Sequence, residues 1–239
     1  MFDDFLNEAV IDDIKKDYFN FPIVLLKEFL IDDRECLNNI FDFAIYSYLN
    51  KEYESDFSQI KEAESFFGVN IGNKRRSFDN GKTLFESIPE NLPFIGIRKS
   101  IWFDYYTNQK TEYQKVVLLA FIAIKSIVGK KTHCKTNNLL WYSRMEGNSH
   151  TVKNVNELSP ELSEYFNEYQ SKKIKNELIL NWNLKHYAYY TRGFYVSFKM
   201  TLEDLIFMAE KNRKSRLLKK VKENEKAAIK RAIDRLYKM

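Results

Sequence analysis

Residues 171–198, with the sequence SKKIKNELILNWNLKHYAYYTRGFYVSF, constrain the fold of this chain more than any other stretch. Their first half has the periodicity of an amphipathic helix. The apolar arc consists of Ile174, Leu178, Ile179 and Trp182, and the polar arc of Lys172, Lys173 and Asn176. The apolar period then changes to two over residues 186–190 and 194–198, and Gly193 between them can supply the positive φ of a short turn. A basic helix that leads directly into a hairpin predicts the second half of a winged helix.

The residues before this stretch predict the other elements of such a domain. They comprise an apolar helix (residues 112–128), a short strand (131–135), a helix with Thr136 as its N-cap (136–145) and a helix that Pro160 opens and that continues into residue 171. We therefore predict a winged-helix domain over residues 111–200.

An earlier part of the chain repeats this order of elements. It predicts helices over residues 34–49, 56–67 and 83–88, then strands over residues 94–97 and 101–106 that turn at Arg98-Lys99-Ser100. The predicted fold class is mainly α with small β-hairpins. Its parts are an N-terminal arm (residues 1–33), a first winged-helix domain (34–110), the second winged-helix domain (111–200) and a basic helical tail (201–239).

Charge is distributed unevenly along the chain. Residues 1–110 carry 13 Lys and Arg against 20 Asp and Glu, whereas residues 111–200 carry 13 against 7 and residues 211–239 carry 12 against 3. A basic rear half suits a polyanion, most often nucleic acid. The partner that we expect is double-stranded DNA.

The third helix of a DNA-binding winged helix enters the major groove, and the hairpin contacts the backbone or the minor groove. Lys and Arg bind phosphates, while Asn and Arg can read base edges. In the second domain this assigns Lys172, Lys173, Lys175 and Asn176 to the helix and Lys185, Tyr190 and Arg192 to the wing. In the first domain it assigns Lys74, Arg75, Arg76 and Lys82 to the helix and Arg98 and Lys99 to the wing tip. Lys175 falls inside the apolar arc, so it can instead extend along the edge of the core.

The basic tail has an apolar stripe beside its Lys and Arg side chains. The stripe consists of Leu217, Leu218, Val221, Ala228, Ile229, Ile233 and Leu236. Such a helix can follow phosphates, pair with a second copy to form a homodimer, or dock on its own protein with a solvated basic face. The stripe lacks Trp and Phe, which disfavours binding to a membrane surface.

Sequence motifs for catalysis or metal binding are absent. His133 and Cys134 are adjacent, but the chain has no CxxC or HxxxH pair and no glycine-rich phosphate loop. Two cysteines, an acidic N-terminus and the lack of a long apolar run predict a soluble protein of the cytoplasm. We expect no enzyme activity, no cofactor, no metal and no small-molecule substrate.

Two winged helices in a chain of this size resemble the replication initiator proteins of plasmids and related mobile elements. The residues that carry the resemblance are SKKIKNELILNWNL and TRG in the second domain and RKS in the first hairpin. The resemblance implies binding to repeated sites in double-stranded DNA at an origin, without cofactor or catalysis. Two alternatives remain open: a transcription regulator, whose sites would lie at promoters, and a non-catalytic protein–protein adaptor built on winged helices.

Overall fold

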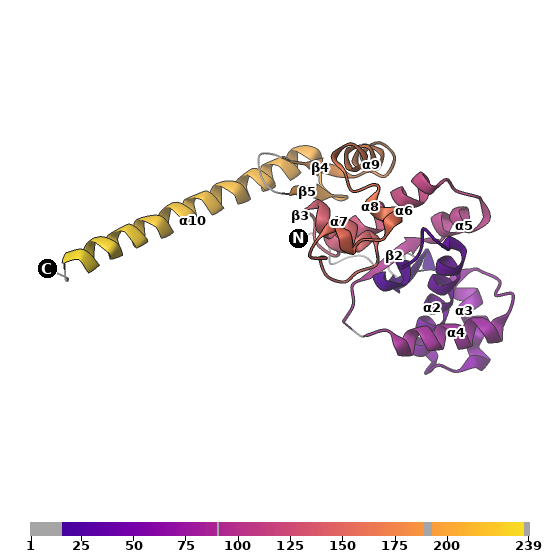
Figure 1. Cartoon of the computed structure of the whole chain (residues 1–239). Coiled ribbons are helices and arrows are strands. Elements are labelled where there is room, and N and C mark those ends of the chain that lie inside the picture. The colour runs from indigo at the N-terminus through magenta and orange to yellow at the C-terminus, as the bar shows by residue number, and fades with distance from the viewer. Residues whose placement is uncertain (1–15, 90, 189–192, 237–239) are drawn as a thin grey trace.

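The structure is a computed structural model that describes residues 16–89, 91–188 and 193–236. Over these ranges the chain is mainly helical, with one antiparallel sheet of two strands and one of three (Figure 1). Helical content and small antiparallel sheets agree with the predicted fold class. None of the helices in these ranges is both long enough and apolar enough to cross a membrane.

The first half of the chain is built around a helix of 21 residues, α2, one face of which is buried. The Asp32 side chain caps this helix by accepting a hydrogen bond from the Glu35 backbone N–H. In order, the elements of this half are β1 (Tyr18–Pro22), η1 (Ile23–Leu26), α2 (Asp33–Tyr53), η2 (Phe57–Gln59), α3 (Ile60–Phe67), α4 (Lys74–Ser87), β2 (Phe94–Arg98) and α5 (Lys99–Thr107).

Strand β2 does not form the predicted hairpin with the residues that follow it. It pairs antiparallel with β1 along its whole length, and the predicted strand over residues 101–106 is helix α5. The aromatic residues there also fit a helical period, since Trp102 and Tyr106 stack with their ring centroids 4.7 Å apart. The Trp102 indole donates a hydrogen bond to the Leu37 carbonyl of α2, which fixes α5 on that helix. The prediction of a wing in this half is therefore wrong.

The residues from 18 onward contribute to the core of this half rather than to a separate N-terminal arm. Strand β1 and η1 both contact α2. The side chains of Phe19, Phe21, Ile23, Leu26 and Phe29 are at most 1% exposed. The partner of β2 thus lies in a segment that the sequence had assigned outside the domain.

Helix α4 begins nine residues before the predicted helix over residues 83–88. Asn73 caps it, accepting a hydrogen bond from the Arg76 backbone N–H at 3.1 Å. Gly81 lies inside the helix, and a Cβ at this position would lie 2.3 Å from the Asp42 carbonyl oxygen of α2. Gly81 therefore permits the close approach of two helices, and α4 continues through it without interruption.

The second half is built around α6, an apolar helix whose N-terminus carries a capping box of Thr111 and Gln114. The Trp141 indole donates a hydrogen bond to the Ala120 carbonyl of α6 at 3.0 Å. In order, the elements are α6 (Glu112–Val128), β3 (Cys134–Thr136), α7 (Asn138–Met145), η3 (Val155–Glu157), α8 (Pro160–Ser163), α9 (Glu168–Asn181), β4 (Lys185–Tyr187), β5 (Phe194–Ser197) and α10 (Leu202–Leu236).

The three-stranded sheet has the order β3–β5–β4, with both pairings antiparallel. The predicted pairing of the two strands around Gly193 is confirmed. Two local predictions are wrong: Asn137, not Thr136, caps α7, and the helix that Pro160 opens ends as α8 before Asn167 caps α9. Thr136 is instead paired with Phe194 in the sheet.

The two halves share one hydrophobic cluster. An ion pair between Lys115 of α6 and Asp33 of α2, at 2.9 Å, also joins them. Helix α10 begins on the second half, where Leu205 and Ala209 are buried, and then extends away from the body (Figure 1). Every residue from Lys214 to Arg231 is exposed.

Candidate nucleic-acid interface

Helix α9 presents one face to the core and one to solvent. Its buried face consists of Ser171, Ile174 and Leu178. The Ser171 hydroxyl hydrogen-bonds at 3.1 Å to the Tyr142 hydroxyl of α7, so the two helices are fixed in rotation against each other. This contact determines which side chains of α9 point outward.

The outward face of α9 carries three of the predicted contact residues. Lys172, Lys173 and Asn176 are all exposed. Lys173 Nζ lies 4.3 Å from the centroid of the Tyr113 ring of α6, which holds the ammonium group beside the helix. Two ammonium groups and an amide on one helix face suit phosphate oxygens and base edges.

Large apolar side chains also lie on the outward side of α9. Tyr169 and Leu180 are 73% and 78% exposed, and Ile179, which the sequence placed in the core, is 39% exposed. The prediction for Ile179 is wrong because α9 buries only about one residue per turn, which leaves Ile179 at the margin. Tyr169 and Leu180 are eleven residues apart and therefore share a face with Asn176, a spacing that was visible in the sequence.

Lys175 does not belong to the outward face. It is half-buried, and its Nζ donates a hydrogen bond to Asn138 Oδ1 at 2.9 Å and lies 4.0 Å from the centroid of the Phe194 ring. Burial lowers the pKa of the Lys175 ammonium to about 8. The structure thus places Lys175 along the edge of the core.

A hollow of about 550 Å³ opens between α7, α9 and β4, and Lys175 and His186 line it. His186 is half-buried, and its Nε2 atom has no hydrogen-bond partner among the described residues. Burial and the nearby Lys175 lower the pKa of His186 to about 4, so the imidazole is neutral at pH 7. His186 stands at the start of the predicted hairpin, but no sequence motif distinguishes it as a site residue.

The hairpin contributes fewer contact candidates than the sequence predicts. Lys185 is half-buried in β4, and its Nζ donates a hydrogen bond to Asn183 Oδ1 at 2.7 Å. Tyr190 and Arg192 lie outside the described residues. Gly193 has a φ of +100°, and a Cβ there would lie 2.3 Å from a backbone oxygen of β3, so the position requires glycine.

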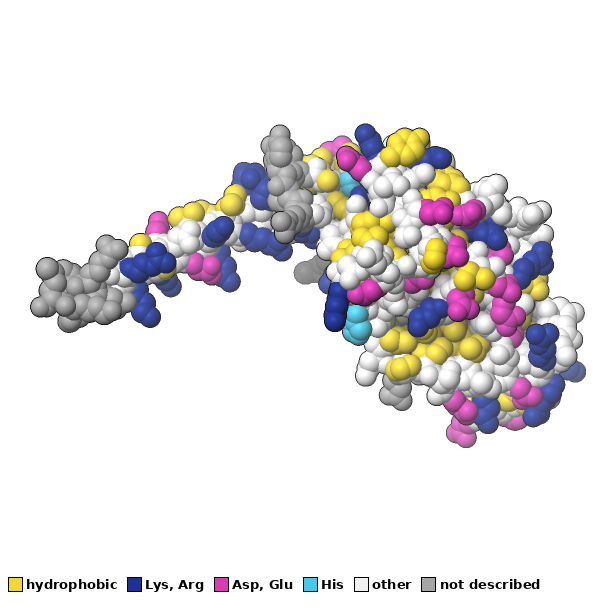
Figure 2. All heavy atoms as spheres, in the orientation of Figure 1, with side chains coloured by type: hydrophobic (Ala, Val, Ile, Leu, Met, Phe, Trp, Pro, Cys, Tyr) yellow, Lys and Arg dark blue, Asp and Glu magenta, His cyan; other side chains and the backbone are white. Residues whose placement is uncertain are grey.

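Helix α10 extends the positive charge beyond the body. Figure 2 shows Lys and Arg side chains along its length, in agreement with the 12 basic and 3 acidic residues of positions 211–239. The predicted apolar stripe is exposed where the structure describes it, with Leu217, Leu218, Val221 and Ile229 all more than half exposed. The helix therefore has a basic side and an apolar side, both in solvent.

The basic residues of α4 differ from those of α9 because most of them have acidic partners. Lys74 pairs with Glu64 of α3. Arg75 pairs with Asp79 at 2.9 Å, and Lys82 with Glu86 at 3.8 Å, one turn further along the same helix. These carboxylates reduce the positive potential that α4 offers to a phosphate.

Arg98 and Lys99 do not lie at a wing tip. Arg98 ends β2, and its Nε donates a hydrogen bond to the Tyr18 hydroxyl of the paired strand at 3.1 Å. Lys99 begins α5, and its Nζ donates to the Phe67 carbonyl at the end of α3. Both predictions of wing contacts are wrong because β2 takes its partner from β1.

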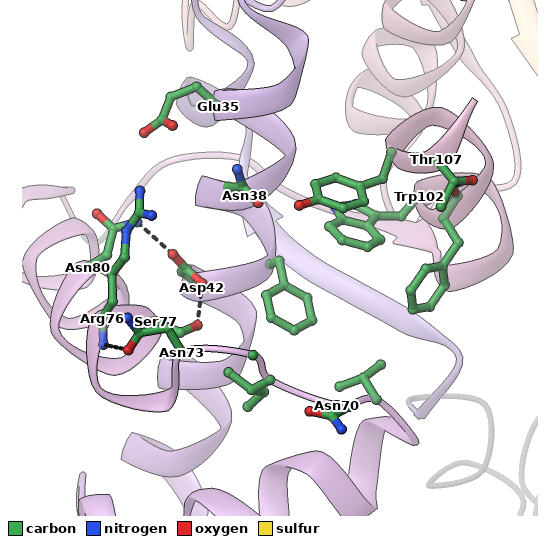
Figure 3. A pocket seen from close by; sticks show the side chains of 16 residues that line it. Glu35, Asn38, Asp42, Asn70, Asn73, Arg76, Ser77, Asn80, Trp102 and Thr107 are labelled. Atoms are coloured by element: carbon green, nitrogen blue, oxygen red, sulfur yellow. Dashed lines mark hydrogen bonds between the residues drawn. The ribbon is translucent and has the colours of Figure 1, made fainter. Parts of the chain in front are cut away.

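Arg76 lines a different hollow, of about 450 Å³, between α2, α4 and α5 (Figure 3). Half-buried Asp42 lies in its wall and accepts hydrogen bonds from the Ser77 hydroxyl and the Asn80 amide. Burial raises the pKa of the Asp42 carboxyl, although these hydrogen bonds and the Arg76 charge oppose the shift. Glu35 adds a second carboxylate to the same wall.

The described residues contain no group of three His, Cys, Asp or Glu side chains that could hold a metal ion. Burial raises the pKa of the Cys36 thiol to about 12 and that of Cys134 to about 11. Both sulfurs are therefore protonated at pH 7 and poor nucleophiles.

Comparison with known proteins adds no family assignment: no family model, no curated protein and no solved structure matches this chain.

Proposed function

We propose that residues 111–200 form a winged helix that binds double-stranded DNA through α9 and the β4–β5 hairpin. The observation that carries the proposal is topological. Apart from the short η3 and α8 between α7 and α9, the order α6–β3–α7–α9–β4–β5 and the sheet order β3–β5–β4 are those expected of a winged helix, in which the first strand pairs with the last. Helix α9 then occupies the position of the DNA-contacting third helix.

The charge of this half supports the same partner. Lys172 and Lys173 are exposed at the position where a third helix meets phosphates, and Asn176 lies beside them. Helix α10 adds basic side chains that could follow the backbone of the same duplex. The affinity would therefore be strongly dependent on salt.

Within DNA-binding proteins we propose a role in replication initiation on a plasmid or mobile element, or in its regulation. The support is the resemblance in element order, which the second half keeps and the first half does not, because its β2 strand has no hairpin partner. We therefore assign DNA contact to the second half and assembly to the first. Sites mapped to promoters rather than to an origin would replace replication with transcription control.

The test is fluorescence anisotropy of the whole protein with a labelled random duplex across a salt series. We expect a steep loss of affinity with rising salt, since each phosphate contact contributes roughly 0.9 to the slope of log K against log salt. In the variant Lys172→Ala/Lys173→Ala/Arg192→Ala, affinity should fall and the slope should decrease by about 3. An unchanged affinity in this variant, with circular dichroism equal to wild type, would remove α9 as the DNA surface.

An adaptor that binds another protein is the second candidate, and the exposed apolar residues of α9 favour it. Tyr169 and Leu180 offer the kind of surface that protein partners bury. The adaptor would show negligible affinity for duplex DNA near physiological salt. It would also retain a defined protein partner after nuclease treatment and lose it on Tyr169→Ser/Leu180→Ser substitution.

A further inference from the structure

The hollow between α7, α9 and β4 combines a half-buried cation with hydrogen-bonding side chains. Lys175 contributes the ammonium group, Asn138 and Asn176 contribute amides, and His186 contributes an imidazole. The hollow adjoins the exposed face of α9, because Lys172 and Asn176 belong to both. A group bound to that face could therefore reach into it.

Lys175 lacks an anionic partner among the described residues. Its one hydrogen-bond acceptor there is the neutral Asn138 Oδ1, and its other close neighbours are the rings of Phe194 and Trp141, with centroids at 4.0 and 5.3 Å from Nζ. An ammonium group can donate three hydrogen bonds, so two remain for a ligand. A half-buried cation without a counter-charge is electrostatically suited to an incoming anion.

His186 also lines the hollow, and its ring lies 5.1 Å from the same Phe194 ring that Lys175 contacts. Its Nε2 atom is inaccessible to solvent and has no partner among the described residues. A buried imidazole nitrogen without a hydrogen bond is costly, and a neutral imidazole can donate one N–H. Because Nε2 is inaccessible, His186 forms a neutral wall of the hollow, and an oxygen-rich anion there would give Lys175 the counter-charge that it lacks.

We propose that this hollow binds one phosphate of the DNA backbone, with Lys175 as its cation and the exposed Asn176 amide as an N–H donor. The inference rests on the proposed function and adds to it a specific anchor beside the exposed lysines. The exposed pair, Lys172 and Lys173, binds phosphates with its charge in solvent. Lys175 would bind a phosphate with an ammonium group that burial has already partly dehydrated, which strengthens the electrostatic interaction.

This arrangement couples DNA binding to the protonation of Lys175. The ammonium pKa of about 8 would rise when a phosphate approaches, so the complex takes up a proton above that pH. The other charged or titratable groups that line the hollow are Lys172 and Glu168 of α9 and His186 of β4. From α7 and β5, the uncharged side chains of Asn138, Trp141 and Phe194 contact the Lys175 ammonium group. His186 stays neutral throughout, because its pKa is about 4.

The experiment measures the Kd of the whole protein for a labelled duplex between pH 6.5 and 9.5 at fixed ionic strength. Wild-type affinity should fall about tenfold from pH 7 to pH 9, as expected for a group with a pKa of about 8 in the unbound protein and an ordinary lysine pKa in the complex. Lys175→Arg should bind with a flat profile, because its guanidinium stays charged. Lys175→Met, which preserves the packing of the stem, should bind more weakly at pH 7, also with a flat profile.

Two results would overturn the inference. A flat wild-type profile, or an unchanged profile in Lys175→Met with a wild-type melting temperature, would show that Lys175 meets no phosphate. In that case the proposed function stands if Lys172→Ala/Lys173→Ala still weakens binding. A wild-type protein that binds no duplex at any pH would overturn both.

Discussion

Each half of the molecule has a hollow beside one helix, α4 in the first half and α9 in the second. The half-buried charged groups in the two hollows have opposite sign. In the first half, α2 and α4 surround the carboxylates of Asp42 and Glu35. In the second half, α7 and α9 surround the ammonium group of Lys175. Burial shifts both groups toward neutrality: it raises the pKa of Asp42 and lowers that of Lys175.

The two halves also differ in the charge that their helices α4 and α9 present to solvent. On α4, Arg75 and Lys82 pair with acidic residues one turn away, and Gly81 holds the helix against α2. On α9, Lys172 and Lys173 have no carboxylate partner among the described residues and point outward. The second half therefore presents unpaired positive charge to solvent, whereas most of the basic side chains of α4 are paired with carboxylates. Three predictions test this contrast.

The largest effect is expected for Gly81→Ala. Its Cβ would lie 2.3 Å from the Asp42 carbonyl oxygen and 2.7 Å from Tyr46 Cβ, so α4 must move away from α2. We expect the free energy of unfolding to fall by about 2–4 kcal/mol, measured by urea denaturation. Gly72→Ala, where a Cβ meets nothing within 4 Å, is the matched control and should be close to neutral. Equal stability of the two variants would mean that α4 is not closely seated.

A smaller effect is expected for the pH dependence of stability at Asp42. Because the folded state raises the pKa of this carboxyl, its contribution to stability is fully present below the unfolded pKa and is lost as the pH rises through the folded pKa. The difference in unfolding free energy between wild type and Asp42→Asn should therefore favour wild type more at pH 4 than at pH 7. Asp79→Asn, at an exposed carboxyl of α4, provides the comparison. A difference that is constant across this range would contradict the raised pKa.

The smallest effect is expected for the charges of α4 in DNA binding. The variant Arg75→Ala/Arg76→Ala/Lys82→Ala should change duplex affinity by less than about twofold and leave the salt slope unaltered, whereas Lys172→Ala/Lys173→Ala should lower the slope by about 2. Both are measured by anisotropy in parallel. A loss of about 3 in slope from the α4 variant would instead make the first half a second DNA surface.

Local periodicity was sufficient for much of the second half. The amphipathic pattern of residues 171–182 correctly placed Lys172, Lys173 and Asn176 outside and Ile174 and Leu178 inside. The strands around Gly193 were identified because a short turn brings neighbouring residues into register. Such signals are carried by residues close together in the sequence, and they need no knowledge of distant partners.

Tertiary structure decided what depends on distant partners. Strand β2 pairs with β1, some 75 residues earlier, and therefore needs no partner strand from the residues that follow it. Those aromatic residues form helix α5 instead of the second strand of a wing. Lys175 is half-buried because it contacts Asn138 and Phe194, which lie far from it in the sequence or on another element. Most of the basic residues of α4 form ion pairs with acidic residues. The sequence determined the amphipathic pattern of α9, the two strands around Gly193 and the charge of each half. Packing determined which charges remain in solvent, because burial and ion pairing are properties of neighbours in space.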